Sequence, residues 1–588
     1  MDKKTWIVVA GCVLLWFGYQ YFLDRYYPPP PHPATPAAAP VTAEAPIAPA
    51  NPPAAVPGSP EPQLLPAEQK FIPETNLAPE KTAVLENQYV RAELTTHGGG
   101  FKTIELKKQK AGKDSTVVLN RGGDLPVFNI AGWTDKYSLI GYDLVSADAK
   151  SATFTRMLQP GVLLTRTYTL TGDYNFELSQ TLSNQSAETK VLPPYRLNLG
   201  VATPVHSNDQ NEKRYITLSW YTKAGSYGSQ NLLAFDPTSF LGIKFSAGKT
   251  LLQSPQNEDI GWAAVKSQFF VLMIHCEEFE AKAVEGRRQY FPDIRREINA
   301  AVPDGIAAEM WIPGVRVDAN TNAAQKFTFY AGPKEDSRLR GLSDNQDKVM
   351  DFGWLAWISR ALLMLMNGIH SFTHNYGVSI ILVTIILRAL LWYPQTMANL
   401  SMKRMQSVAP LMKEIQGKYK DSPEKLNQEM LKIYQDYGVN PVGGCLPMLI
   451  QFPIFLGFYY MLQSAIELRY EHFLWITDLS QPDTIAILPM LNLPLNPMPL
   501  IMTATMVISM QMTPQPAGVD NPTAKMMKFM PVIFLAFCYN FSSALSLYWT
   551  MQNILSVFQM RYNMKQAPPS LEALKLQAQT RRKKQKKR

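Results

Sequence analysis

A positive charge lies inside an apolar segment of this 588-residue chain. Arg388 falls within the run Gly377–Tyr393, which is long enough to cross a bilayer. A charged side chain at that depth costs about 3 kcal/mol on insertion scales. Either the side chain snorkels to the nearby interface, since Pro394 follows closely, or it faces a polar cavity enclosed by protein. The second interpretation gives the chain a positively charged binding site within the membrane.

Other polar residues recur on the apolar segments. Thr384 precedes Arg388 by one helical turn and so shares its face. Hydrogen bonds between helices explain one or two such residues, whereas a full stripe together with an arginine favours a hydrophilic groove. No acidic residue within these segments is an obvious partner for Arg388, which favours hydration and an acidic visitor. The remaining candidates are Gln451 from one segment and, at helical spacing in the last, Tyr548, Gln552, Ser556 and Gln559.

The chain offers little for catalysis. Its four cysteines show no CxxC or Cys/His spacing typical of a metal site. Three histidines of the polar half (His97, His206 and His275) suit a sugar-type site only if carboxylates join them, and isolated histidines are far commoner. The run 242–250 resembles a phosphate loop but has five spacer residues where the motif has four. We therefore expect no enzyme activity, no metal and no cofactor.

The first half of the chain is polar, and the second is apolar and rich in methionine. Residues 1–27 hold Lys3-Lys4 and an apolar run ended by bulky aromatic residues, which favours an uncleaved transmembrane anchor. Residues 28–70 form a Pro/Ala-rich linker. From 71 to 345 apolar residues alternate with polar ones, as in Thr165–Leu170 and again after the turn Gly172-Asp173. This period predicts hairpins within a large β-sandwich.

Loop charges orient the apolar segments. Residues 395–442 carry seven Lys/Arg, whereas 467–485 carry one Arg and four acids, so the basic loop is predicted to be cytoplasmic. Residues 350–370 then lie flat in the outer interface as an amphipathic helix. We expect a multi-domain membrane protein with six spans, both termini cytoplasmic and the β domain outside. Besides the anchor, the spans are about 376–393, 443–464, 487–512, 527–541 and 544–562, within a core of residues 371–565.

Two further segments are predicted to face the cytoplasm. Residues 395–440 have the pattern of a helical hairpin whose second helix starts at Pro423, a residue well suited to the first helical position. The tail, 566–588, is basic: from Arg561 onward ten Lys/Arg stand against one acid, and 10 − 1 = +9 equals the net charge of the whole chain. Such a tail suits rRNA phosphates and anionic lipid head groups equally well.

Three segments resemble those of a known family. Val439–Phe455, Phe529–Phe534 and Ser543–Trp549 are similar to signature segments of the YidC/Oxa1/Alb3 membrane protein insertases. The likeness covers about 350–565. The anchor, linker and large β domain resemble the Gram-negative form of this family, whose extra domain is a β-supersandwich of the sugar-mutarotase type.

The resemblance implies a function and a site. It implies a hydrophilic groove with one positive residue, matched by Arg388, while Thr384 and the pair Tyr548-Trp549 match positions that meet the client. Trp549 stands where the family often has a second Tyr. The implied protein is a multi-pass insertase and chaperone of the bacterial inner membrane, with its large domain periplasmic. It would insert nascent membrane proteins alone or beside the Sec translocon, with a ribosome docked. A small-solute transporter and a membrane-tethered carbohydrate-active enzyme are the alternatives.

Overall fold

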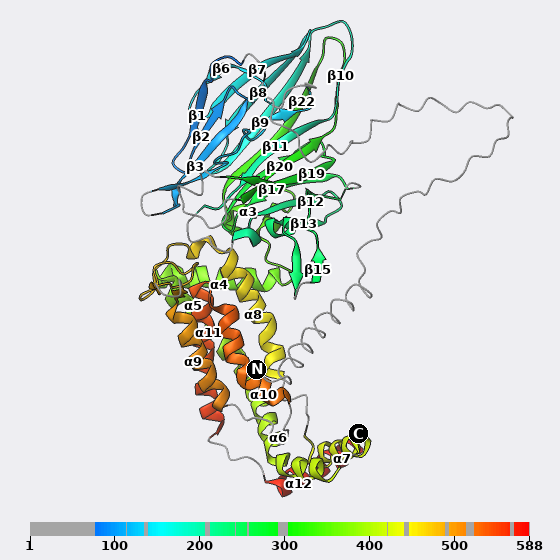
Figure 1. Cartoon of the computed structure of the whole chain (residues 1–588), viewed down its shortest axis with the longest axis vertical. Helices are drawn as coiled ribbons and strands as arrows, with labels where there is room; N and C mark the ends of the chain where they lie inside the picture. Colours follow the sequence, from blue (N-terminus) through cyan, green and yellow to red (C-terminus); the bar gives the residue numbers. More distant parts are fainter. Residues whose placement is uncertain are drawn as a thin grey trace, which may run out of the picture. The chain divides into compact units, whose positions relative to one another are not determined.

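The computed structural model describes residues 74, 77–112, 115–133, 139–205, 212–240, 243–255, 258–291, 304–419, 422–439, 446–488, 493–512, 522–564 and 570–586. The expected anchor (1–27) and linker (28–70) lie outside these residues. The described residues of 67–518 and 531–588 belong to one compact unit. Strands occupy its first part and helices its second (Figure 1).

The largest sheet has nine antiparallel strands. In β8 and β9 every second residue is buried, and the two strands pair from Val162↔Asn184 to Leu170↔Phe176, which confirms the predicted hairpin. β17 and β18 are buried at every residue, because both of their faces are covered. In sheet order the strands are β13 (Tyr227–Asn231), β12 (Thr217–Thr222), β17 (Ile260–Lys266), β18 (Phe270–Cys276), β22 (Asn322–Pro333), β9 (Asn175–Asn184), β8 (Val162–Leu170), β7 (Ser151–Gln159) and β6 (Asp143–Ala147).

Smaller sheets complete the β domain. One has five strands: β16 (Leu252–Gln253), β19 (Ala283–Tyr290), β20 (Asp304–Ile312), β11 (Tyr195–Ala202) and β5 (Ile130–Ala131). Another has four: β1 (Thr82–Glu86), β2 (Val90–Thr95), β3 (Gly100–Lys110) and β4 (Thr116–Leu119). The pairs β10 (Lys190–Leu192) with β21 (Val315–Val317) and β14 (Thr238–Phe240) with β15 (Ile243–Ser246) lie beside them. The predicted β-sandwich is confirmed.

The helical part begins after β22. Asn375 caps α5, since its side chain accepts a hydrogen bond from the Val378 N–H at 2.9 Å. Pro423 starts α7, and Gly438 ends it in the left-handed conformation. The helices are α3 (Asp336–Leu339), η3 (Gln346–Met350), α4 (Ala356–Thr373), α5 (Tyr376–Leu390), α6 (Trp392–Lys418), α7 (Pro423–Tyr437), α8 (Leu446–Ser464), η5 (Ile466–Leu468), α9 (Pro497–Met512), α10 (Pro522–Cys538), α11 (Ser543–Met564) and α12 (Leu571–Lys586).

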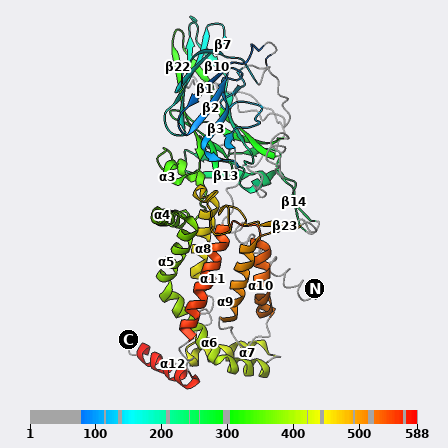
Figure 2. The same ribbon diagram turned by 90° about the vertical axis from the view of Figure 1, so that its left-hand side faces the viewer.

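Within the described residues, no single helix combines the length and the hydropathy of a membrane crossing. The successive helices α5 and α6 meet that requirement together, with a bend of 63° between them. Among the other helices, α9 and α11 pack side by side (Figure 2).

One expected span begins elsewhere. We expected a span from 487, but β23 (Ala486–Leu488) pairs with β24 (Leu493–Leu495), and α9 starts at Pro497. Proline lacks the N–H that a helix interior needs, so Pro494 cannot extend the helix backward, whereas Pro497 fits its first turn. The Asp483 carboxylate accepts from the Met498 N–H at 2.7 Å and so caps the new start.

Candidate functional site

Arg388 is buried in the helical part. Its side chain lies on α5, is 7% exposed, and comes within electrostatic reach of the Tyr548 hydroxyl on α11. Among the described residues, no atom accepts a hydrogen bond from its Nε. Thr384, one turn earlier, is also buried, but its hydroxyl donates to the Ile380 carbonyl at 2.7 Å within the same helix. The arginine, not the threonine, therefore keeps hydrogen-bonding capacity for another molecule.

A chain of hydrogen bonds joins α8 to α11 beside the arginine. The Gln451 amide donates to the Tyr548 hydroxyl at 2.9 Å, and the Gln552 amide donates to the Gln451 oxygen at 2.9 Å. The Tyr548 ring stacks on Phe458, with ring centroids 4.1 Å apart. Three of the residues predicted to line the groove are thus brought together, and Gln451 is their centre.

Trp549 has different surroundings from its neighbour Tyr548. Its ring lies 4.7 Å from that of Phe455 and 4.8 Å from that of Phe534, measured between centroids. Adjacent residues on a helix point about 100° apart, which follows from its 3.6 residues per turn. Trp549 therefore adds an aromatic wall between α8, α10 and α11 rather than a polar group.

The lower part of the predicted stripe contacts another helix. Gln559 is fully buried, and its amide donates to the Trp392 carbonyl at 3.1 Å and to the Thr396 hydroxyl at 3.0 Å, both at the start of α6. Ser556, which lies between Gln552 and Gln559 in the sequence of α11, is half-buried. Gln559 thus lies on the predicted helix but does not join the Tyr548–Gln451–Gln552 chain.

Sequence reasoning missed several buried polar residues. The Asn553 amide donates to the Met502 carbonyl and the Thr505 hydroxyl, both at 3.3 Å, and so links α11 to α9. Asn399 on α6 and Asn563 on α11 are 2% and 3% exposed. Asn563 follows Gln559 by one helical turn, so its position in the stripe was available from the spacing. Asn399 lies in a segment that we assigned to the cytoplasmic hairpin, where a buried amide was not expected.

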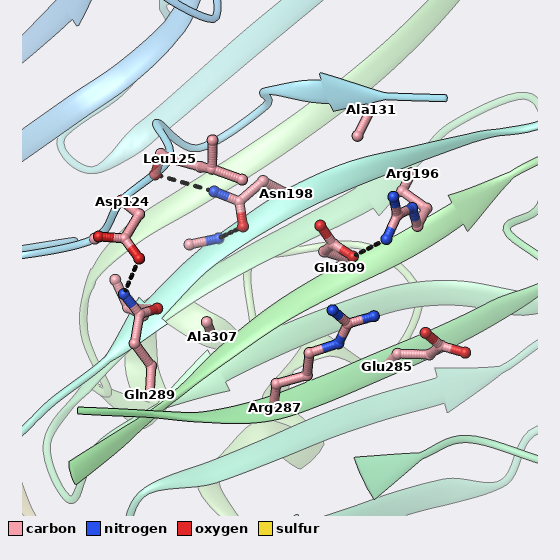
Figure 3. A pocket seen from close by; sticks show the side chains of 13 residues that line it. Asp124, Leu125, Ala131, Arg196, Asn198, Glu285, Arg287, Gln289, Ala307 and Glu309 are labelled. Carbon is pink, nitrogen blue, oxygen red and sulfur yellow. Dashed lines mark hydrogen bonds and ion pairs between the residues drawn. The ribbon is translucent and has the colours of Figure 1, made fainter. Parts of the chain in front are cut away.

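The β domain contains a polar cavity of about 160 Å³ on the five-stranded sheet. Figure 3 shows Arg196 facing Glu309, 3.1 Å away, and Gln289 donating to Asp124 at 2.8 Å. Arg287 extends from β19 into the same cavity. A second polar cavity of the β domain, about 190 Å³, is lined by Glu74, Lys81, Asp143 and Arg156.

The histidines do not gather at the cavity on the five-stranded sheet. His275 lies on β18, where its Nε2 is 2.6 Å from the Asp344 carboxylate and its Nδ1 is 3.2 Å from the Thr328 hydroxyl. His97 bonds the Ala78 carbonyl at 2.8 Å, and His206 lies outside the described residues. The two described histidines therefore do not form the sugar-type site that we considered.

The basic tail contains a docked helix. Leu574 of α12 is 2% exposed and packs with Val408, Met412 and Ile433 in a small apolar core shared with α6 and α7. The arginines and lysines that follow continue the same helix to Lys586. A segment that we described only as a basic tail thus forms part of a three-helix unit.

Comparison with known proteins identifies both halves of the chain. Residues 82–365 match the family described as YidC periplasmic domain, and residues 368–570 match the family described as 60Kd inner membrane protein. A protein of Syntrophobacter fumaroxidans named membrane protein insertase YidC is 31% identical, over 95% of this chain and 99% of its own length. A protein of Pelobacter propionicus with the same name is 29% identical, over 96% of this chain and 99% of its own.

Solved structures are more distant. An active YidC insertase covers 83% of this chain and 94% of its own at 15% identity, with a TM-score of 0.34. A galactose mutarotase related enzyme from Lactobacillus acidophilus covers 43% of this chain and 97% of its own at 10% identity, with a TM-score of 0.28. At those scores neither structure supports an argument about this chain. The family is supported instead by the two family matches and by the Syntrophobacter fumaroxidans protein, which is 31% identical over nearly the whole chain. These matches confirm the resemblance: the chain belongs to the YidC family of membrane protein insertases.

Proposed function

We propose that this protein inserts nascent membrane proteins into the bacterial inner membrane through a groove centred on Arg388. Family membership supports the insertase activity, the inner-membrane location and the periplasmic position of the β domain. It favours neither the transporter nor the carbohydrate-active enzyme. The observation that carries the groove is the buried guanidinium, whose Nε has no partner among the described residues and which lies beside Tyr548.

Arg388 supplies the attraction for a client. A carboxylate or polar stretch of the client takes the free guanidinium N–H, and the resulting charge-assisted bond is about twice as strong as a neutral one. Gln451 and Gln552 bond to each other and to Tyr548, and these neutral bonds can exchange for bonds to the client. In membrane bundles such bonds are worth only about 0.6 kcal/mol each, so the exchange is inexpensive.

The aromatic residues supply the route into lipid. Trp549, Phe455 and Phe534 form an apolar wall beside the polar chain, and Ile533 and Phe537 on α10 are exposed. An apolar client segment that follows this wall moves toward lipid, driven by about 25 cal/mol for each Å² of apolar area removed from water. Thr384, Ser556 and Gln559 complete the lining between α5, α6 and α11. This drive requires no nucleotide.

The three-helix unit of α6, α7 and α12 is the proposed platform for partners. With both termini cytoplasmic, the lysine- and arginine-rich sequence of the tail suits rRNA phosphates of a docked ribosome or anionic lipid head groups. The Sec translocon is a further proposed partner beside the bundle. The expected position of residues 350–370 in the outer interface fits the exposure of Trp354, just before α4, and of Trp357 within it, at 74% and 72%.

The decisive experiment uses the full-length protein in liposomes. A short membrane protein with an acidic tail is added, and its protease-protected fraction is compared for wild type, Arg388→Ala and the control Arg561→Ala. Arg561 is an exposed arginine at the end of α11. Loss of one charged hydrogen bond, about 1.5–3 kcal/mol, predicts a fall of about tenfold or more for Arg388→Ala. The control should match wild type.

A second client separates charge from packing. With the acidic tail replaced by a neutral polar tail, wild type and Arg388→Ala should insert at nearly equal rates. Equal rates with the acidic tail would reject the role of Arg388, and no insertion by wild type above empty liposomes would reject autonomous insertion.

A further inference from the structure

Four buried polar residues line the contact between α6 and the end of α11, and one of them, Gln559, also belongs to the proposed groove lining. We call them the polar seam: Asn399 and Lys403 on α6, and Gln559 and Asn563 on α11. Their exposed fractions are 2%, 6%, 0% and 3%. Each pair is separated by one helical turn, so each pair lies on a single helix face. α6 and α11 contact each other along this stretch (Figure 2).

The seam contains polar atoms without partners. Among the described residues, no hydrogen-bond partner is found for the side-chain oxygens of Asn399 and Gln559 or for the side-chain nitrogen of Asn563. An unpaired buried polar group costs about 1–3 kcal/mol. Leucine, of similar size, would fill the Asn399 and Asn563 positions without that cost. Packing between α6 and α11 therefore does not explain the amides.

The seam continues the groove. From Tyr548 to Asn563, α11 rises about 22 Å at 1.5 Å per residue. On the facing side, Arg388 on α5 leads through the bend to Asn399 and Lys403 on α6. The Lys403 ammonium donates to the Asn563 main-chain carbonyl and so fixes the two helices together at the far end. Polar residues thus follow one another along α11 from Tyr548 to Asn563, although Gln559 is hydrogen-bonded to α6 and not to the Tyr548–Gln451–Gln552 chain.

We infer that the polar seam binds the peptide backbone of the client's hydrophilic segment before that segment reaches Arg388. The inference rests on the proposed insertase function. The unpaired atoms include two acceptors and one donor, which match the N–H and C=O groups that every peptide unit offers. An extended chain rises about 3.3 Å per residue, so the distance from Tyr548 to Asn563 along α11 equals the length of about seven extended residues.

The choice of backbone as ligand follows from the chemistry of the side chains. Neutral amides bind the main chain of any sequence, whereas Arg388 selects acidic or polar side chains. Two tasks are therefore separated along one line: the seam holds the hydrophilic segment of any client, and Arg388 discriminates among clients by charge. Water could satisfy the same atoms, so the experiment must distinguish a peptide from water.

The test uses the full-length protein in liposomes and a client with a neutral hydrophilic tail, which does not depend on Arg388. The variants are Asn399→Leu, Asn563→Leu and, as a matched control, Asn553→Leu, whose amide is already paired with α9. Loss of one hydrogen bond of about 1 kcal/mol predicts a fall in insertion of about fivefold for each seam variant. Their melting temperatures should stay level or rise, because an unpaired polar group is removed. The control should melt earlier.

Cross-linking then identifies what occupies the seam. A photoreactive side chain at position 563 should attach to the client's tail, whereas one at the adjacent Tyr562, which is 59% exposed, should not. Seam variants that insert like wild type, or a position 563 that never attaches to the tail while insertion proceeds, would overturn the inference and leave water as the occupant. If wild type inserts neither client, the proposed function itself is overturned.

Discussion

A single glycine sets how closely α4 approaches α8. A Cβ added at Gly457 would lie 2.5 Å from the Ile358 Cγ2 and 3.4 Å from the Leu362 Cδ1. The first distance is too short for two carbon atoms, so one helix must move. Ser359 is also held there, since its hydroxyl donates to the Gly457 carbonyl at 3.0 Å. Gly457→Ala should therefore push α4 away from α8.

Gly368 provides the matched control, because it lies in α4 with no atom within 4 Å of its added Cβ. Alanine is a better helix former than glycine by about 1 kcal/mol at either position. At Gly368 that gain is retained. At Gly457 it is opposed by an overpacking cost of about 1–3 kcal/mol. The free energies of unfolding of the two variants should thus differ by about 1–3 kcal/mol, with Gly457→Ala the less stable.

Thermal unfolding in detergent tests whether Gly457→Ala is less stable than Gly368→Ala. Insertion assays in liposomes test whether the shift between α4 and α8 lowers activity. α8 carries Gln451, so a displaced α8 weakens the bond between Gln451 and Tyr548 and lowers insertion. Ile358→Leu removes the Cγ2 branch and should partly restore Gly457→Ala. The reasoning fails if Gly457→Ala melts at or above Gly368→Ala, or if Ile358→Leu gives no rescue.

Three further predictions concern buried or docked residues elsewhere. Burial and the neighbouring Lys266 hold the pKa of Lys334 well below its ordinary 10.5. The unfolded chain therefore binds more protons than the folded one, and the stability of the wild type rises with pH up to about pH 10.5. Lys334→Met should melt higher than wild type at pH 7, and melting curves recorded over a pH series should no longer show this rise. Truncating the buried Leu574 by Leu574→Ser should cost about 2–5 kcal/mol of packing free energy and so undock α12. Trypsin should then remove the tail faster, while the melting temperature of the transmembrane bundle stays unchanged. Arg166→Met should lower the melting temperature of the β domain, because the Phe128 carbonyl and the Gln180 side-chain oxygen lose their donor, while the Gly99 carbonyl keeps the Tyr168 hydroxyl. Insertion should persist if the groove suffices.

The alternation of apolar and polar residues predicted individual strands well, but it did not predict the order of the strands in the sheets. The alternation in β8 and β9 is a property of neighbouring residues, and so is the turn at Gly172-Asp173 that joins them. The five-stranded sheet places β11 between β20 and β5, which are far apart in the sequence. No spacing rule in a single chain reports such a pairing, because it depends on which faces the finished sandwich covers.

Helix boundaries show the same division. Pro423 marked the start of α7, since proline is favoured at the first helical position. For α9 the sequence is mostly apolar from 487 onward, with Asn492 and Asn496 as the exceptions before Pro497, so hydropathy alone predicted an early start. The prolines at 494 and 497 carried the correct information, and Ile487 and Leu488 pair with Pro494 and Leu493 instead of joining the helix. Backbone chemistry here outweighed average hydropathy.

The candidate site shows why spacing predicts a surface but not a function. The stripe on α11 was readable because Tyr548 and Gln552 recur at helical intervals. Whether a polar side chain in that stripe is paired depends on other helices: Gln451 satisfies Tyr548, and α6 satisfies the Gln559 nitrogen. Paired amides explain how a bundle holds together. The unpaired atoms of Arg388 and the polar seam do not help to hold the bundle together, because each one destabilises the protein when no client is bound. A binding partner that supplies the missing hydrogen bonds removes this cost only while it is bound.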